Sequence, residues 1–406
     1  MLKYLLVLFI GLLPGILLAQ IPVDTTNVDI DTTGQKDLID VARALFHPSL
    51  KGTKYGKYRP KKEVYFTFLP LSTDVPGGSK ALVTSTTAGF YLGDRKTTYI
   101  STVLFTPYTN FKGRYGLPIH SSLWTDSNKY NIEGETYFLR YPADTWGLGG
   151  GQSENNKVVV NYDYIRFYQS VLRRIKPYLY VGAGYNLDYY VDVNTDNAVL
   201  PSFTDYKYGT AQNSNSVTTG VTINILYDTR QNLFNPIPGS YMNIVYRHNA
   251  EFIGSADNAQ SIYVDLRKYV SLNTAGLYKN LIAFWTYYWS TLTPGTPYLA
   301  LPAIGMDPYN RSGRGIEQSR YRGNALFYFE SEYRRDITQN GLFGFVIFAN
   351  VNSATQPNGY HFEYLNPAAG GGLRIQLNKK SGTNFCVDYG FSRGYSDLIL
   401  SLGEAF

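Results

Sequence analysis

From residue 63 onward, apolar and polar residues alternate along a series of short stretches. In the stretch 325–336, Phe327 and Phe329 fall on one face of an extended backbone, and Glu330 and Glu332 fall on the other. Successive side chains of a β-strand point to opposite faces, so this pattern predicts a strand with one apolar and one charged face. The first face suits lipid, and the second suits water or a charged partner.

Sixteen stretches of this kind follow one another, separated by clusters of Gly, Asn, Asp and Pro. We expect strands at 63–71, 81–92, 98–108, 113–124, 129–141, 157–173, 176–190, 217–229, 239–252, 259–272, 277–291, 323–336, 341–352, 368–378, 383–393 and 397–406. Hydrocarbon tolerates no free sheet edge, and an even number of antiparallel strands closes without one. The pattern therefore predicts an all-β fold, a 16-stranded antiparallel transmembrane β-barrel over residues 63–406. A soluble sandwich would share the period but not the pairing of apolar with charged faces.

The N-terminal part of the chain, residues 1–62, differs in its pattern from the rest. Residues 1–19 carry a long apolar run with Lys3 before it and a small-residue cleavage site, which is the pattern of a secretory signal peptide. We therefore expect an exported protein of the bacterial outer membrane, with residues 20–62 as a short periplasmic linker. The spacing within 37–46 predicts a short helix that lies at the periplasmic surface or plugs the barrel; a simple tethering turn is the alternative.

Composition and charge narrow the choice further. The chain has one Cys, which excludes disulfides within it, and 38 Tyr and 38 Gly, which suit a membrane barrel. Its formal net charge of +6 is matched by the six basic residues within 51–62. This tract is either a solvated linker or a contact for anionic lipid headgroups. Because the basicity is so local and the protein is exported, we expect no nucleic-acid partner.

The turn between the eighth and ninth predicted strands carries a distinctive pattern, YDTRQNLFNPIPGSY over residues 227–241. Proline interrupts strand pairing and glycine permits the turn, while an acidic and a basic residue two positions apart share one face. The pattern resembles the D-x-R-x-x-x-F-x-P-x-x-G turn of the BamA/TamA-like outer-membrane insertase superfamily, the bacterial surface antigen barrels. The matching positions are Asp228, Arg230, Phe234, Pro236 and Gly239. A chance turn rich in Pro and Gly is the alternative.

A second resemblance lies in the connection 292–322, which is external if both chain ends are periplasmic. In that superfamily, an Arg-Gly-aromatic loop tip folds into the lumen and its arginine pairs with inward acidic residues. Arg314 and Gly315 look like this tip, with Ile316 in place of the aromatic. The resemblance implies that Arg314 pairs with Glu332, and Glu330 is a second candidate.

On the next strand, Asn350 stands where the superfamily has a carboxylate, so its contact with the arginine should be a hydrogen bond without charge assistance. A solvated loop without lumenal contacts is the alternative to this whole arrangement. The resemblance covers the whole barrel and is most convincing over 217–406. Phe406 ends the last predicted strand, and the resemblance implies that it belongs to a C-terminal insertion signal. Leu402 fits this signal, whereas Glu404 departs from it.

The resemblance implies a noncatalytic barrel that assists insertion or translocation of proteins or lipids at the outer membrane. No POTRA domain fits within 20–62, so outer-membrane lipid, separate periplasmic partner proteins and client membrane proteins are the expected partners. The alternative is a structural or pore-forming barrel without insertase activity, and a lipid hydrolase is a weaker option. We expect no cofactor and no metal, because the four His residues match no nucleophile or metal spacing. The oligomeric state stays open.

Overall fold

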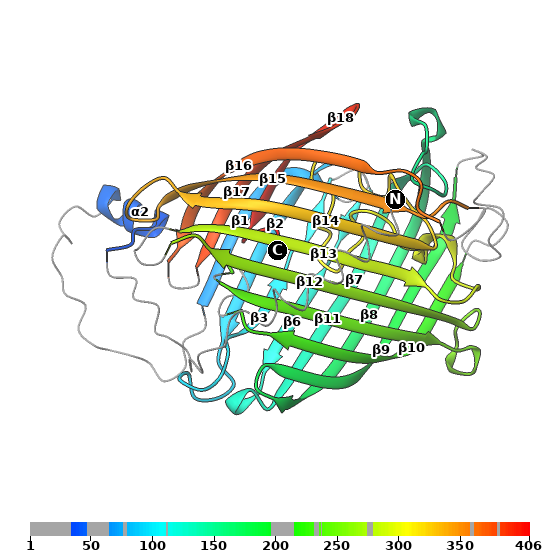
Figure 1. Ribbon diagram of the computed structural model, residues 1–406, viewed down its shortest axis with the longest axis horizontal. Helices are drawn as coiled ribbons and strands as arrows, with labels where there is room; N and C mark the ends of the chain where they lie inside the picture. The colour runs from blue at the N-terminus through cyan, green and yellow to red at the C-terminus, as the bar shows by residue number, and fades with distance from the viewer. Residues whose placement is uncertain are drawn as a thin grey trace.

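A computed structural model describes residues 34–46, 65–75, 79–110, 113–195, 215–230, 235–236, 238–273, 279–357, 361–379 and 382–406. Its strands form one antiparallel sheet that curls into a barrel (Figure 1). The strands are β1 (Tyr65–Val75), β2 (Ser79–Phe90), β3 (Ser101–Phe105), β4 (Tyr108–Thr109), β5 (Tyr115–Gly116), β6 (Ile119–Trp124), β7 (Tyr130–Thr145), β8 (Val158–Lys176), β9 (Leu179–Asn194), β10 (Ser216–Asp228), β11 (Gly239–Asn249), β12 (Ala259–Ser271), β13 (Asn280–Thr291), β14 (Ala325–Asp336), β15 (Phe343–Ala354), β16 (Asn366–Asn378), β17 (Thr383–Ser392) and β18 (Tyr395–Leu402). The predicted signal peptide, 1–19, and the basic tract, 51–62, lie outside the described residues.

The eighteen strands correspond to the sixteen predicted spans, because two spans are interrupted. β3 and β4 follow one another along β2, and β5 and β6 follow one another along β7. The breaks fall at Pro107 and Pro118, which have no backbone N–H to give to a ladder. Their carbonyls still accept hydrogen bonds, from Thr84 N at 2.9 Å and from Thr106 N at 3.1 Å. The prediction of a sixteen-stranded antiparallel barrel is confirmed, with two broken spans that the alternation did not reveal.

Neighbouring strands pair in chain order around the barrel. Among the described residues, a hydrogen-bonded register joins each neighbouring pair from β1 to β18. β1 and β18 lie in contact with each other, without such a register, and so form the seam of the barrel. The seam is therefore held by fewer backbone hydrogen bonds than the rest of the wall.

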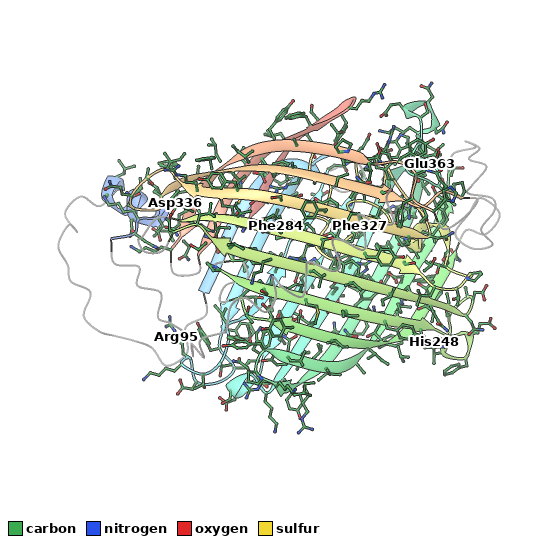
Figure 2. All side chains as sticks on the ribbon, in the orientation of Figure 1. Arg95, His248, Phe284, Phe327, Asp336 and Glu363 are labelled. Atoms are coloured by element: carbon green, nitrogen blue, oxygen red, sulfur yellow. The ribbon has the colours of Figure 1, made fainter. Side chains whose placement is uncertain are left out.

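The two faces of the wall differ as the alternation predicts. On β14, Tyr328, Glu330 and Glu332 are fully buried toward the lumen. Phe284 of β13 and Phe327 of β14 lie on the outward face of the front wall (Figure 2). Large apolar side chains stay exposed on the outward face of strand after strand, and these include Phe167, Val221, Ile223, Phe284, Ile347, Leu373, Tyr389 and Leu398. Such a belt is what hydrocarbon requires of a transmembrane barrel.

The prediction for the last strand was wrong at its end. We expected an extended strand to Phe406, but β18 ends at Leu402. Gly403 has a φ of +77°, a conformation that glycine adopts readily, and the chain turns inward there. Phe406 is 3% exposed and packs on Trp285 of β13, with 5.2 Å between ring centroids. The aromatic ring lies inside the barrel because a large apolar surface in the lumen is available to it.

The predicted short helix is present as α2 (Leu38–Phe46). Its first turn is tied to the turn that follows β16, where Lys379 Nζ lies 2.6 Å from Asp40 Oδ2 and Lys379 N donates to Asp37 Oδ2 over 3.0 Å. Lys36 N also donates to the carbonyl of Asn340, in the turn between β14 and β15. α2 therefore rests on the turns at the short-turn end of the barrel (Figure 1), as the surface alternative requires. None of the described helices is long and apolar enough to cross a membrane.

The outward belt allows a direct test of lipid exposure at Ile347. Ile347 is 57% exposed and lies in the middle of β15. We expect Ile347→Arg to lower the free energy of unfolding by about 2–4 kcal/mol, because an arginine at the bilayer midplane is poorly solvated. Urea titration of the barrel in lipid vesicles measures this quantity.

Phe252 provides the matched control, since it is 88% exposed in the connection between β11 and β12. Phe252→Arg should lower the free energy of unfolding by no more than about 1 kcal/mol. Equal costs for the two substitutions would show that the belt around Ile347 does not face hydrocarbon.

Candidate functional site: a loop tip bound inside the lumen

The connection between β13 and β14, residues 292–324, folds back into the barrel. Ile304 and Arg314 within it are 0% and 3% exposed, a degree of burial that a surface loop does not reach. The loop supplies its own backbone partners, because Ile304 N donates to Tyr321 O over 3.0 Å and Ser319 N donates to Ile304 O over 2.9 Å. A loop buried in a lumen needs such partners, since unpaired backbone groups away from water are costly.

Two glycines shape the tip of this loop. Gly313 and Gly315 have φ values of +78° and +85°, and they place Arg314 between them. Gly313 N donates to the hydroxyl of Tyr328 over 3.1 Å, and Gly315 N donates to Asp397 Oδ1 over 3.0 Å. A Cβ on Gly315 would lie 2.5 Å from the backbone nitrogen of Phe391 on β17. The predicted Gly at 315 is therefore required by both its conformation and its contact with the wall.

The guanidinium of Arg314 lies among three carboxylates of the wall. Its Nη1 donates to Asp388 Oδ2 over 2.8 Å, and its Nη2 contacts the carboxylates of Glu330 and Glu332. The guanidinium carbon also lies 3.7 Å from the ring centre of Phe348, a cation–π contact. Charge-assisted hydrogen bonds from one arginine thus join the loop tip to β14 and β17.

The surrounding charges extend this cluster. Arg334 contacts Glu332, and Arg374 Nη1 lies 2.5 Å from Asp388 Oδ1. The hydroxyl of Tyr328 donates to Glu330, which has no second arginine within reach among the described residues. The arginines therefore balance most of the buried negative charge, and Glu330 depends on Arg314 most directly.

The predicted lumenal residues come together, with one correction and one omission. Glu330 and Glu332 both contact the Arg314 guanidinium. The Asn350 amide does not; it donates to the backbone carbonyl of Arg314 over 2.9 Å, so it orients the tip and leaves the charge to others. Asp388 supplies the third carboxylate and was missed. Its place on the inward face of β17 is visible in the alternation, but its distance from the loop is not.

The predicted turn motif lies at the opposite end of the barrel from the long loops. Arg230 Nη2 donates to Asp228 Oδ2 over 2.8 Å, and Arg230 stacks over the ring of Tyr241 at 4.0 Å. Pro236 is buried, and Gly239 begins β11, where a Cβ would lie 3.0 Å from the Thr229 carbonyl oxygen. Phe234 lies outside the described residues. The charged pair closes the lumenal face of this turn.

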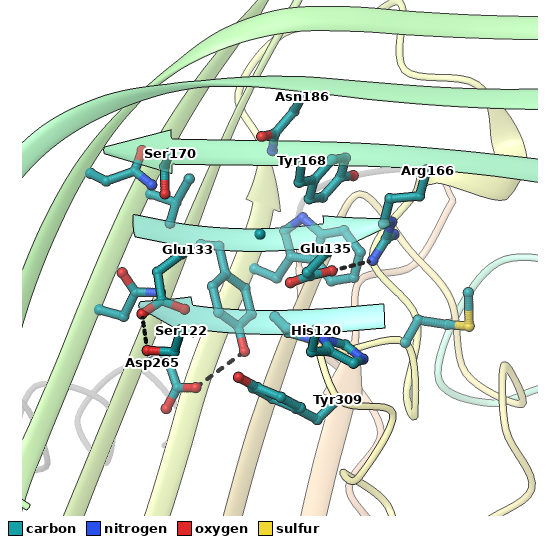
Figure 3. A pocket seen from close by; sticks show the side chains of 18 of the residues that line it. His120, Ser122, Glu133, Glu135, Arg166, Tyr168, Ser170, Asn186, Asp265 and Tyr309 are labelled. Atoms are coloured by element: carbon teal, nitrogen blue, oxygen red, sulfur yellow. Dashed lines mark hydrogen bonds and ion pairs between the residues drawn. The ribbon is translucent and has the colours of Figure 1, made fainter. Parts of the chain in front are cut away.

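A second charged cluster lines the wall formed by β7, β8, β9 and β11. Asp188 accepts from Arg166 Nε over 3.3 Å and from Arg247 Nη1 over 2.6 Å, and Arg166 Nη1 also lies 3.1 Å from Glu135 Oε2. Together with the loop and with residues 402–406, this wall lines a cavity of about 310 Å³ (Figure 3). Paired charges of both signs leave the cavity wall polar but largely neutral.

Among the described histidines, His120 lines this cavity. Its Nε2 is 3.0 Å from the hydroxyl of Tyr137, and its ring stacks on Tyr309 with 4.7 Å between centroids (Figure 3). Ser122, on the same strand, donates instead to Glu133 over 2.7 Å. These side chains therefore do not form a serine–histidine pair. Over the described part of the chain, no group of three or more His, Cys, Asp or Glu residues is placed to hold a metal ion.

The fold has counterparts among solved structures. BamA from Haemophilus ducreyi lacking POTRA domains 1–3 superposes with a TM-score of 0.52 at 13% identity, over 85% of this chain and 69% of that one. The chain has a BamA-like barrel fold. CdiB from Acinetobacter baumannii (TM-score 0.51, 13% identity) and CdiB from Escherichia coli (0.53, 11%) share it. These two matches cover 82% and 85% of this chain, and 56% and 62% of the respective CdiB chains. No protein-family model matches the chain, and no curated protein matches its sequence.

The contacts of Arg314 predict a large loss of stability on its removal. Arg314→Ala leaves Glu330 without a cation and Glu332 and Asp388 with one fewer, and breaking a buried pair in this way costs about 3–5 kcal/mol. We expect the variant to unfold at lower urea concentration in vesicles. Arg314→Lys should recover part of the loss, since a lysine keeps the charge without the planar fork. A change within about 0.5 kcal/mol for Arg314→Ala would contradict the cluster.

The backbone of Gly315 allows an independent test of the tip. Gly315→Ala introduces both a positive-φ alanine and a clash with Phe391 N. Gly394 is the control, because its φ is +79° and nothing lies within 4 Å of the place that a Cβ would take there. We expect Gly315→Ala to lower the free energy of unfolding by about 1–3 kcal/mol more than Gly394→Ala does. Indistinguishable urea midpoints would mean that the tip is not seated against β17.

Proposed function

We propose that this protein is an outer-membrane barrel of the BamA/TamA-like superfamily that assists the insertion or translocation of membrane proteins. Outer-membrane lipid and client proteins are its partners, together with separate periplasmic proteins. The observation that carries the proposal is the seating of Arg314 on inward carboxylates within a barrel of BamA-like fold. A loop tip with this much buried charge is costly to build and therefore argues for a role beyond closure of a wall.

The proposed site of client binding is the seam between β1 and β18. Strand edges with unpaired N–H and C=O groups template the pairing of another strand. In hydrocarbon those groups must be satisfied, so an opened seam would bind an incoming strand strongly. Among the described strand pairs, β1 and β18 are in contact without a register, which makes this junction the one that opens at least cost.

A cluster of charged side chains inside the lumen acts on the wall beside the seam. We call it the Arg314 cluster, and it consists of Arg314, Glu330, Glu332, Arg334, Arg374 and Asp388. It joins β14 to β17 across the lumen through one guanidinium, and so it stiffens the wall beside the last strand. Opening is then confined to the β1–β18 junction. Loss of Arg314 would spread the motion over neighbouring strands and lower the fraction of barrels with a single, ordered opening.

The lumen favours this proposal over a water-filled pore. Residues 292–324 and 402–406 occupy part of it, and the remaining cavity of about 310 Å³ is lined by side chains from both and from the wall. A conducting channel would require the buried loop, including Ile304 and Arg314, to leave the lumen.

The test is a folding assay in liposomes that contain the full chain. An unfolded client barrel should acquire its folded, heat-modifiable form faster than in empty liposomes, and Arg314→Ala should reduce the rate. Arg140→Ala is the matched control, because Arg140 is 60% exposed and lies away from the loop. Equal client folding rates with and without the protein would overturn the proposal. Stable single-channel conductance or fatty-acid release in the same liposomes would instead identify a pore or a hydrolase.

A further inference from the structure

Residues 403–406, which we call the lumenal tail, leave the wall at the end of β18. Gly403 N donates to the carbonyl of Asn384 over 2.9 Å, so the turn begins against β17. Glu404 and Phe406 are then 7% and 3% exposed, and both lie within the lumen. Because β18 is one edge of the seam, any contact that holds the lumenal tail also restrains that edge.

The carboxylate of Glu404 has a specific binding site. Arg374 Nε of β16 donates to Glu404 Oε2 over 2.7 Å, and Asn384 Nδ2 of β17 donates to its Oε1 over 2.8 Å. A buried carboxylate with charge-assisted partners on both oxygens is strongly held, and the same carboxylate without them would be costly to bury.

Phe406 is held by a separate set of contacts across the lumen. Its ring packs on Trp285 of β13 and on Tyr269 of β12, with centroids 5.2 Å and 6.2 Å apart. Arg334 of β14 stacks over the ring at 5.1 Å, and its Nη2 donates to the Phe406 carbonyl over 2.9 Å. The lumenal tail thus connects β18 to strands several positions around the barrel.

The loop 292–324 also donates hydrogen bonds to the end of β18 and to the lumenal tail. Arg311 Nη2 donates to the carbonyl of Leu402 over 3.1 Å, and Arg311 Nη1 donates to the carbonyl of Glu404 over 2.9 Å. The described part of the chain gives Arg311 no carboxylate within salt-bridge distance, so its hydrogen bonds to this segment are its main polar contacts.

The loop tip and the lumenal tail share charged partners. Arg374 binds both Glu404 and Asp388, and Asp388 also binds Arg314. Arg334 forms a second connection, because it contacts Glu332 and the Phe406 carbonyl. Release of the lumenal tail would therefore remove Glu404 from Arg374 and the Phe406 carbonyl from Arg334, and would leave Arg374 with Asp388 and Arg334 with Glu332.

The geometry points to the lumenal tail as an internal lock on the seam: β18 moves away from β1 only after Glu404 and Phe406 leave their sites. Outward movement of β18 with the lumenal tail in place would pull Glu404 from Arg374 and Phe406 from Trp285. The purpose of the opening rests on the proposed function, whereas the lock itself depends only on these contacts.

The single Cys of the chain reports directly on the lock. Cys386 is 1% exposed on β17, and its Sγ lies 3.2 Å from the carbonyl oxygen of Gly403. The experiment measures the rate at which a water-soluble maleimide modifies Cys386 in the folded, detergent-solubilised full chain. We expect slow modification of the unchanged protein, because the lumenal tail covers the thiol.

The double variant Glu404→Gln, Phe406→Ala should be modified at least about tenfold faster, the ratio expected when local opening loses a charge-assisted hydrogen bond. Glu363→Gln is the matched control, since Glu363 is an exposed residue of an external loop (Figure 2) and should leave the rate unchanged. Phe406→Leu keeps most of the apolar volume and should stay near the unchanged rate. Heat-modifiability on gels establishes that each variant is folded.

Amide hydrogen exchange then shows whether loss of the lumenal tail contacts frees β18 or merely exposes the Cys386 thiol. In the double variant, the backbone amides of β18 should exchange faster while those of β8 and β9 keep their rates. An unchanged maleimide rate would overturn the inference, and so would rapid maleimide modification with unchanged exchange in β18. Neither measurement uses a client protein, so a failed client-folding assay would sink the proposed function and leave the lock standing.

Discussion

The lumenal interior of this barrel depends on one guanidinium that is surrounded by carboxylates. Arg314 is 3% exposed, and it contacts Glu330, Glu332 and Asp388 from two different strands. Burial of an unpaired arginine, or of any one of these carboxylates alone, would carry a large desolvation free energy. The loop and the wall therefore require each other. The position of the loop tip against β14 and β17 follows from this mutual requirement.

The barrel separates two kinds of contact by the period of its strands. Outward positions need little more than apolar surface, because lipid makes no specific demands on them. Inward positions carry charges that must find partners across a narrow space. On the wall that contains β14 and β17, those partners include the loop tip and the lumenal tail. On the wall that contains β8 and β9, Asp188 finds Arg166 and Arg247 within the wall itself, and the cavity lies beside that self-contained cluster.

This difference between the walls gives the barrel a mechanical asymmetry. The charged pairs of Asp188 can persist while the wall of β14 and β17 changes its charged partners, and β7, β8 and β9 also pack against the loop. The seam and the lumenal tail belong to the second wall, where Arg374 serves both Glu404 and Asp388. A rearrangement at the seam therefore reaches the loop tip through a shared arginine.

The pattern of residues along the chain is enough to predict the barrel. Strict alternation, an even strand number and turn-forming residues specify which residues face lipid, and each of the sixteen predicted spans appears at its expected place, with the proline breaks as local exceptions. The sequence also indicated Arg314, Gly315, Glu330 and Glu332, because a matching loop and strand pattern are local features. The role of Asp388, the backbone contact of Asn350 and the inward turn of Phe406 become visible in the folded barrel alone. Those choices depend on which inward side chains meet across the lumen, and the distance between such side chains is set by closure of the barrel and by no feature of the chain near them.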